Sequence, residues 1–316
     1  MCLESLVAQR GVACEILVVD DHSTDRTREI AASFSQVRVI DAGRLPAGWT
    51  GKANAVTCGA REARGEWLLF TDADTVHKEG SLARALAEAG ECRVTLLSYS
   101  PEQEVRSFVE LAVMPVIFAE LAAQYQPSEV SDPNSDAAAA NGQYVLISRE
   151  AYDAVGGHAA IAGSLLEDVE LARAVKRSGR AIFFRFGGDR VQTRMYRSTT
   201  QLIEGWSKNL VLLFPSPIRL AVLRGSEFTC IWASGLLGIV LLVRGDLAVG
   251  GALFVACAML KLLLLRRILR AHFSWKANAV ASFGLPIFAY LLLRSVIQYR
   301  RGRVAWKGRS YPGSAA

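Results

Sequence analysis

Residues 65–74, which read Gly-Glu-Trp-Leu-Leu-Phe-Thr-Asp-Ala-Asp, join an apolar run to two carboxylates at its end. The run at 68–70 is typical of a strand buried on both faces, and in open α/β sheets ligands bind beyond the carboxyl ends of such strands. If the strand continued, Asp72 and Asp74 would share a face, which suits Mg²⁺ or Mn²⁺ clamped to a phosphate-bearing substrate. An acidic turn without a ligand is the alternative interpretation, and the neighbouring motifs decide between the two.

The composition separates a polar part of the chain from an apolar part. The mean hydropathy of +0.23 is high for a soluble enzyme, and the excess lies in long apolar runs between residues 228 and 299. We therefore expect four regions, which are a catalytic domain at 1–200, an interfacial linker at 201–226, transmembrane helices at 227–300 and a basic tail at 301–316.

Charge and cysteine content narrow the class of partner. The chain has a net charge of +6, but its basic residues crowd the apolar third, at Arg266, Arg267, Arg270, Arg300, Arg301, Arg303, Lys307 and Arg309. A membrane surface explains this placement better than a nucleic acid, so we expect no nucleic-acid partner.

The six cysteines are scattered without metal-binding spacing, which is typical of reduced cytosolic thiols. We expect no signal peptide, because the N-terminus lacks a basic start followed by an apolar run.

Strands and helices alternate along the first 200 residues. Residues 15–19 are typical of a buried strand that ends in Asp20 and Asp21, and a helix at 25–34 and a strand at 37–40 follow. This βαβ order predicts a parallel sheet. Lys52 then opens a further helix, where it suits a phosphate because helix N-termini favour anions; a solvated lysine is the alternative.

Further along, two motifs carry candidate site residues. Gly156 and Gly157 precede His158, and Glu167 and Asp168 open an amphipathic helix. Acidic residues are favoured in a first helical turn by the helix dipole, so simple helix capping is an alternative interpretation of the second motif.

The apolar segments leave the membrane topology open. Residues 108–123 favour an interfacial helix, whereas 228–243, 247–265 and 277–299 are three candidate membrane spans. The basic loop at 261–276 and the basic tail both favour the cytosolic side, yet a single span between them would separate them. A re-entrant segment near 283–286 is one resolution.

Taken in order, six motifs resemble those of a family 2 glycosyltransferase. They are residues 18–25, Gly51-Lys52 with Ala55, Asp72-Ala73-Asp74, Asn141-Gly142-Gln143, Gly156-Gly157-His158 and Glu167-Asp168. Residues 108–118 and 306–311 are similar to the membrane-bound group that includes ceramide glucosyltransferases and hopanoid- or carotenoid-associated bacterial glycosyltransferases. The resemblance implies an α/β fold: a GT-A, Rossmann-like nucleotide-sugar-binding domain with a mainly parallel sheet, followed by transmembrane helices.

The resemblance also implies roles on the donor side. Asp20 and Asp21 would bind the base and ribose of a nucleotide sugar, Lys52 its diphosphate, and Asp72 the ribose and metal, with Asp74 as the direct metal ligand. The divalent metal, Mg²⁺ or Mn²⁺, would neutralise the leaving diphosphate.

On the acceptor side, Asp168 would be the general base and Glu167 would orient the acceptor or the base. His158 would line the acceptor site, although a structural turn histidine is the alternative. Many family members carry Q-x-x-R-W; here Trp206 follows Gln201 at a longer spacing without the preceding Arg. An acceptor-side role for Trp206 is therefore a weaker implication.

The family's usual first strand, roughly V-S-V-I-I-P-x-x-N-E, is missing from the sequence. Because that strand lies in the middle of the sheet, we expect the functional protein to be longer at its N-terminus.

We therefore expect an inverting enzyme that moves a sugar from a nucleotide-sugar donor, first of all a UDP-sugar, to a lipid-like acceptor. It would be a multi-pass protein of the inner membrane with a cytoplasmic catalytic domain. A processive polysaccharide synthase and a catalytically inactive membrane scaffold with this fold are the alternatives.

Overall fold

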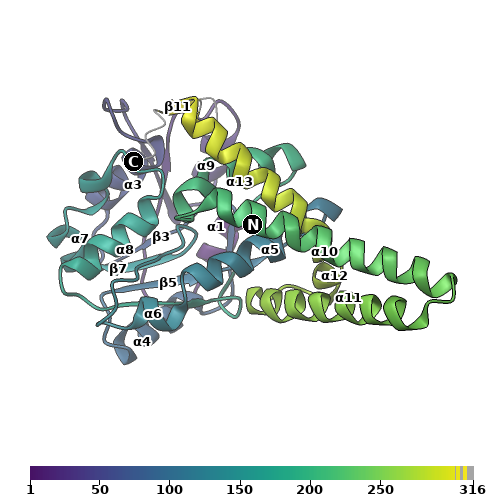
Figure 1. Cartoon of the computed structure of the whole chain (residues 1–316). Helices are drawn as coiled ribbons and strands as arrows, with labels where there is room; N and C mark the ends of the chain where they lie inside the picture. Colours follow the sequence, from purple (N-terminus) through teal and green to yellow (C-terminus); the bar gives the residue numbers. More distant parts are fainter. Residues whose placement is uncertain (303, 307–308, 312–316) are drawn as a thin grey trace. The chain divides into compact units, whose positions relative to one another are not determined.

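The computed structural model describes residues 1–302, 304–306 and 309–311 (Figure 1). The chain forms two compact units, of which the first is Met1–Glu104 with Tyr125–Arg194 and the second is Val105–Gln124 with Met195–Ala316. The sequence analysis placed residues 105–124 in the catalytic domain. They lie in the second unit because their apolar side chains, such as Val113 and Ile117, join its core. Arg303 and Lys307 of the predicted basic tail lie outside the described residues.

The first unit contains three sheets. Strands β1 (Ile16–Asp20) and β2 (Val37–Asp41) form a parallel pair joined by α2 (Thr27–Ala32), as the βαβ prediction requires. A four-stranded sheet has the order β3-β7-β5-β8 and a three-stranded sheet the order β4-β9-β6. The bounds of these strands are β3 (Trp67–Phe70), β4 (Thr75–His77), β5 (Leu96–Ser100), β6 (Glu102–Gln103), β7 (Val145–Ser148), β8 (Ile182–Phe186) and β9 (Val191–Thr193).

The four-stranded sheet is mixed, since β3, β5 and β8 run in one direction and β7 runs in the other. Strand β7 runs antiparallel to both β3 and β5, whereas β5 and β8 are parallel. The long connection after β6 allows this reversed direction of β7. The chain leaves the first unit for residues 105–124 and then enters the sheet through the turn before β7.

Among the described residues, β1 pairs with no strand but β2, and β3 with none but β7. The predicted additional N-terminal strand stays a prediction.

Both faces of the four-stranded sheet are buried, as the apolar run at 68–70 predicts. Neighbouring residues alternate between two cores: Leu96 packs with α8 (Glu167–Arg177) on one face, and Leu97 packs with α4 (Ser81–Glu91) on the other. The remaining helices of this unit are α1 (Cys2–Val7), α3 (Gly51–Glu62), α6 (Pro127–Ser131), α7 (Arg149–Ala154) and the 3₁₀ helix η1 (Gly157–Ile161).

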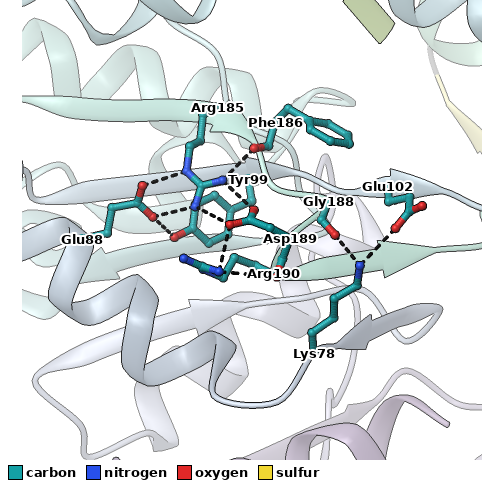
Figure 2. Close-up of polar contacts among 9 residues, drawn as sticks. All are labelled: Lys78, Glu88, Tyr99, Glu102, Arg185, Phe186, Gly188, Asp189 and Arg190. Atoms are coloured by element: carbon teal, nitrogen blue, oxygen red, sulfur yellow. Dashed lines mark hydrogen bonds and ion pairs between the residues drawn. The ribbon is translucent and has the colours of Figure 1, made fainter. Parts of the chain in front are cut away.

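A polar network fastens α4 to the edge of this sheet (Figure 2). Arg185 on β8 donates to both carboxylate oxygens of Glu88 on α4, at 2.7 and 2.9 Å, and to Asp189 at 2.8 Å. The Tyr99 hydroxyl also donates to Glu88, and the guanidinium of Arg185 lies 4.4 Å from the Tyr99 ring centre. Burial opposes ionisation of Glu88, but the bonds from Arg185 and Tyr99 hold its pKa below its usual value.

Where the structure describes it, the second unit is helical apart from the antiparallel pair of short strands β10 (Val304–Trp306) and β11 (Arg309–Tyr311). Its helices are α5 (Phe108–Gln124), α9 (Thr199–Leu213), α10 (Pro217–Val243), α11 (Leu247–Ile268), η2 (Leu269–Ala271), α12 (Trp275–Val280), η3 (Ala281–Phe283) and α13 (Gly284–Arg300). Four segments are long and apolar enough to cross a membrane, namely Phe108–Ser131, Pro217–Val243, Leu247–Ala271 and Trp275–Arg300. The sequence analysis expected three of these and took the first for an interfacial helix.

The Arg185 network generates a prediction for stability. Arg185→Lys keeps the charge but loses the two-pronged contact with Glu88, so we expect a loss of about 2 kcal/mol and a lower melting temperature in detergent. The matched control is Arg180→Lys, because Arg180 pairs with Glu150, whose side chain is 71 % exposed, and such a pair contributes at most about 0.5 kcal/mol. Equal melting temperatures for the two variants would contradict a stabilising role for the network.

Candidate active site

Asp72 and Asp74 lie in a tight turn between β3 and β4. The N–H of Thr75 donates to the carbonyl oxygen of Asp72 at 3.1 Å, so the strand does not continue through the pair as the sequence analysis assumed. The hydroxyl of Thr193 on β9 donates to the carbonyl oxygen of Asp74 at 3.2 Å. This bond to a neighbouring strand fixes the conformation of the acidic turn.

A second layer of bonds joins this turn to the Asn141-Gly142-Gln143 motif. The side-chain amide of Gln143 donates to the Thr193 hydroxyl at 3.3 Å, and the hydroxyl of Thr71 donates to the carbonyl oxygen of Gln143 at 2.9 Å. The Nε2 of buried His77 lies 3.1 Å from the Thr71 hydroxyl. Two motifs far apart in the sequence thus form one rigid group. The sequence analysis missed Thr193 and His77 because single residues on short strands carry no pattern.

Lys52 lies at the centre of the site. The α3 helix begins at Gly51, where the Thr50 hydroxyl caps it by accepting the N–H of Ala53 at 3.1 Å. The ammonium of Lys52 then lies 2.8 Å from Asp72 Oδ1 and 2.8 Å from Glu167 Oε1. Burial alone would lower the pKa of Lys52, but Asp72, Glu167 and Asp168 together raise it well above its usual value. Lys52 is therefore a permanent cation at this site.

Asp168 faces the same group from the start of α8. Its Oδ2 accepts the N–H of Gly142 at 2.7 Å and its Oδ1 accepts its neighbour Val169's N–H at 2.9 Å. Burial and the adjacent Glu167 raise the pKa of Asp168 to about 6, although Lys52 opposes the rise. Such a carboxylate is ionised near neutral pH and binds a proton more readily than an ordinary aspartate, as a general base requires.

Residue 142 lies where a side chain would come too close to two charged groups. A Cβ atom there would lie 2.8 Å from the Lys52 ammonium and 3.3 Å from Asp168 Oδ2. Because glycine has no side chain, the backbone at residue 142 can lie close to both charged groups, which explains the glycine in the Asn141-Gly142-Gln143 motif.

The site carries an excess of negative charge that fits a divalent cation. Asp72, Asp74, Glu167 and Asp168 contribute four carboxylates against the one ammonium of Lys52. Burial and the neighbouring Asp72 raise the pKa of Asp74 to about 6. Hard oxygen donors of this kind suit Mg²⁺ or Mn²⁺. Among residues 1–302, however, no group of three or more His, Cys, Asp or Glu side chains is arranged to hold a metal, so a bound metal would need ligands from a substrate as well.

His158 is packed inside the first unit. Its Nδ1 lies 3.1 Å from the Tyr152 hydroxyl, its ring meets Phe70 edge-on at 4.8 Å, and burial lowers its pKa to about 4. Gly157 allows this packing, because a Cβ there would lie 2.4 Å from the Tyr152 ring. These contacts favour the structural interpretation of His158, while the acceptor-side role stays a prediction.

The other predicted site residues lie in separate groups of contacts. Asp20 is buried at the end of β1, where it accepts the N–H of Ser23 at 3.2 Å and lies 3.6 Å from Arg28; Asp21 follows it. Trp206 is buried in the core of the second unit, and its indole N–H donates to the sulfur of Met114 at 3.4 Å. The roles of Asp20, Asp21 and Trp206 in substrate binding stay predictions.

The sequence is similar to a known family and to named relatives. Residues 1–156 match the family model described as glycosyl transferase family 2. The 4,4'-diaponeurosporenoate glycosyltransferase of Staphylococcus aureus is 26 % identical over 212 residues, which are 65 % of this chain and 55 % of the relative. The enzyme of the same name from Staphylococcus haemolyticus is 26 % identical over 223 residues, 66 % of this chain and 56 % of the relative. The chain thus spans about half the length of the curated relatives it matches.

Among solved structures, the chain is similar to the mannosyltransferase PcManGT from Pyrobaculum calidifontis in complex with GDP-Man and Mn²⁺. The TM-score is 0.49 at 16 % identity, covering 94 % of this chain and 81 % of that one.

The mixed α/β fold of the first unit agrees with the GT-A fold expected from the sequence. Residues 1–156 are therefore identified as a glycosyltransferase family 2 domain.

Gly157 generates a prediction about the site's packing. Gly157 and Gly179 both have a positive φ, of 54° and 81°, but a Cβ at Gly179 meets open space. We expect Gly157→Ala to lower the melting temperature by several degrees more than Gly179→Ala, because both variants strain the backbone by about 1–2 kcal/mol and the first also displaces Tyr152. Equal shifts in circular-dichroism melts would show that Tyr152 and His158 are loosely packed.

Proposed function

We propose that this protein transfers a sugar from a nucleotide-sugar donor to a lipid-like acceptor, with inversion at the anomeric carbon. The observation that carries the proposal is the convergence of Lys52, Asp72, Glu167 and Asp168, in which one cation links carboxylates from two separate motifs. A UDP-sugar is the first donor to test.

On the donor side, Lys52 and the acidic turn would bind the diphosphate. Asp74 and Asp72 would hold Mg²⁺ or Mn²⁺ together with phosphate oxygens, and Asp20 and Asp21 would bind the nucleoside. The metal, when bound, would neutralise the charge that develops on the departing diphosphate. Lys52 would add a fixed positive charge to the same group without any proton transfer.

On the acceptor side, Asp168 would take the proton from the acceptor hydroxyl as its oxygen attacks the anomeric carbon. The bond from that carbon to the diphosphate oxygen breaks at the same time, so the nucleoside diphosphate leaves with the electron pair and the configuration inverts. The N–H of Gly142 holds Asp168 in place, and Glu167, tied to Lys52, would orient the acceptor or the base.

Two observations support a lipid-like acceptor and a membrane location. The relatives' name specifies 4,4'-diaponeurosporenoate, a carotenoid, and four helices of this chain are apolar and long enough to cross a membrane. An apolar acceptor would gather in the bilayer beside such helices. We place the reaction at the cytoplasmic face of the inner membrane.

Asp168→Asn tests the proposed base. Because the amide cannot take up the acceptor's proton, we expect the release of UDP in the presence of acceptor to fall by a factor of about 10²–10⁴, with donor affinity unchanged. The release is measured with purified protein, Mn²⁺ and a panel of UDP-sugars and carotenoid or sterol-like acceptors. Asp153→Asn, which changes an exposed aspartate, is the matched control. Normal transfer by Asp168→Asn would rule out this base, and wild-type protein inactive with every donor would favour the scaffold alternative.

The pH dependence of transfer provides a second test. Since kcat/KM follows the ionisation of the free enzyme, it should fall below about pH 6 as Asp168 becomes protonated. Lys52 lowers the pKa of Asp168 and Glu167 raises it. The acidic limb should therefore move to higher pH in Lys52→Gln and to lower pH in Glu167→Gln. Shifts of the two variants in the same direction would contradict the assignment of this limb to Asp168.

A further inference from the structure

The four apolar segments of the second unit differ in how much of their surface the protein covers. About half of the most apolar stretch is buried in Phe108–Ser131 and in Trp275–Arg300 (50 % each), against 11 % in Pro217–Val243 and 17 % in Leu247–Ala271. Helices α5 and α13 touch where a Cβ on Gly284 would lie 1.9 Å from the carbonyl oxygen of Ala112. Protein therefore covers a larger share of the apolar surface of α5 and α13 than of α10 and α11, while Tyr290, Leu293 and Ile297 of α13 are exposed.

Helices α10 and α11 lie side by side as an antiparallel hairpin (Figure 1). Gly245, with φ of 89°, and the Asp246 side chain, which accepts the N–H of Val249 at 3.1 Å, form the turn at its tip. Large apolar side chains on the outer surface of the hairpin are exposed: Leu236, Leu237, Ile239, Val240, Val243, Leu247, Val249, Phe254, Val255, Met259, Leu262 and Leu263. No protein segment among the described residues covers them.

The two helices contact each other through small residues. A Cβ on Gly250 would lie 2.8 Å from the backbone N of Leu242, one on Gly238 would lie 3.1 Å from the carbonyl oxygen of Gly250, and one on Gly235 would lie 3.0 Å from the sulfur of Cys257. Close backbone contact at glycine is how helices associate in lipid, where apolar side chains gain nothing by leaving the solvent.

Apart from Lys261, the charged residues of the hairpin lie at its two ends. At its base, Arg224 lies 3.0 Å from Glu120 of α5 and 2.7 Å from Glu227, and Arg267 lies 2.9 Å from Glu227. From there to Arg244 the α10 helix has no charged residue, a length of about 24 Å at 1.5 Å per residue. On α11, Lys261 is the one charged residue between Asp246 and Arg266. Its ammonium lies 5.0 Å from the centre of the Trp232 ring, near the base of the hairpin.

We propose that the α10–α11 hairpin is the bilayer anchor of this protein. It enters the hydrocarbon from one side, turns at Arg244–Asp246 where the long Arg244 side chain reaches the far headgroups, and returns to the side it entered from. Helices α5 and α13 stay outside the hydrocarbon core. This inference concerns anchoring alone and does not depend on the proposed reaction.

The proposal resolves the topology conflict in the sequence. If α13 does not cross the bilayer, the basic residues after α11 and those after α13 lie on one side, as Arg270 and Arg301 both favour. No re-entrant segment near 283–286 is needed, and that stretch instead begins α13 against α5.

Spin-label depth measurements test the anchor. In the full chain with its six cysteines replaced, single cysteines are placed at positions of comparable exposure, Val240 and Val255 on the hairpin and Tyr290 and Leu293 on α13. In vesicles of phosphatidylcholine and phosphatidylglycerol, the hairpin labels should be more accessible to oxygen than to a water-soluble nickel complex, and the α13 labels should show headgroup or aqueous accessibility. A Leu293 label as deep as the Val240 label, or a Val240 label in water, would overturn the proposal. Only variants that keep the parental melting temperature are compared.

Labelling in sealed membrane vesicles supplies an independent readout that needs no purified protein. A membrane-impermeant maleimide should reach Arg270→Cys and Arg301→Cys from the same side and Arg244→Cys from the opposite side. Labelling of Arg270→Cys and Arg301→Cys from opposite sides would show that α13 crosses the bilayer and would overturn the proposal.

Discussion

The contact of the Lys52 ammonium with Asp72 and Glu167 is the interaction on which the site depends. It joins three elements that the chain builds separately, namely the start of α3, the turn after β3 and the start of α8. Without this cation, three or four carboxylates would face one another in a partly buried space, and their mutual repulsion would raise their pKa values or push the elements apart. A metal and a diphosphate bring further positive and negative charge to the same place, so the cluster suits a ligand of mixed charge.

The rest of the first unit keeps these elements in position. Two apolar cores cover the faces of the mixed sheet, and the bonds of Thr193, Gln143 and Thr71 make the acidic turn and the Asn141-Gly142-Gln143 motif one group. Glycine matters where backbone must approach a side chain closely, as Gly142 does at Asp168 and Gly157 at Tyr152. The second unit uses the same device for another purpose, since glycines at 235, 238 and 250 bring α10 and α11 together.

Much of this arrangement follows from local sequence patterns. The apolar run at 68–70 and the βαβ order at 15–40 predicted a sheet buried on both faces and the parallel pair β1–β2. The family resemblance implied roles for Lys52, Asp72 and Asp168, and the structure brings these side chains together. The antiparallel course of β7 was not predictable, because strand direction depends on the route of a long connection rather than on periodicity. Nor was the role of Thr193, a single residue on a short strand. The sequence also did not show that α5 packs in the second unit, because hydropathy does not reveal whether protein or lipid covers an apolar face.

The proposed reaction requires Asp72 and Asp74 to hold a divalent metal jointly with a nucleoside diphosphate. The electron paramagnetic resonance signal of free Mn²⁺ tests it, because the signal falls as the ion binds. Weak Mn²⁺ binding to the protein alone is expected, since among the described residues no group of three or more His, Cys, Asp or Glu side chains is arranged to hold the ion. Binding should be at least about tenfold tighter when UDP is added, and Asp74→Asn should abolish this gain. Mn²⁺ binding that is unchanged by UDP, or that survives in Asp74→Asn, would contradict it.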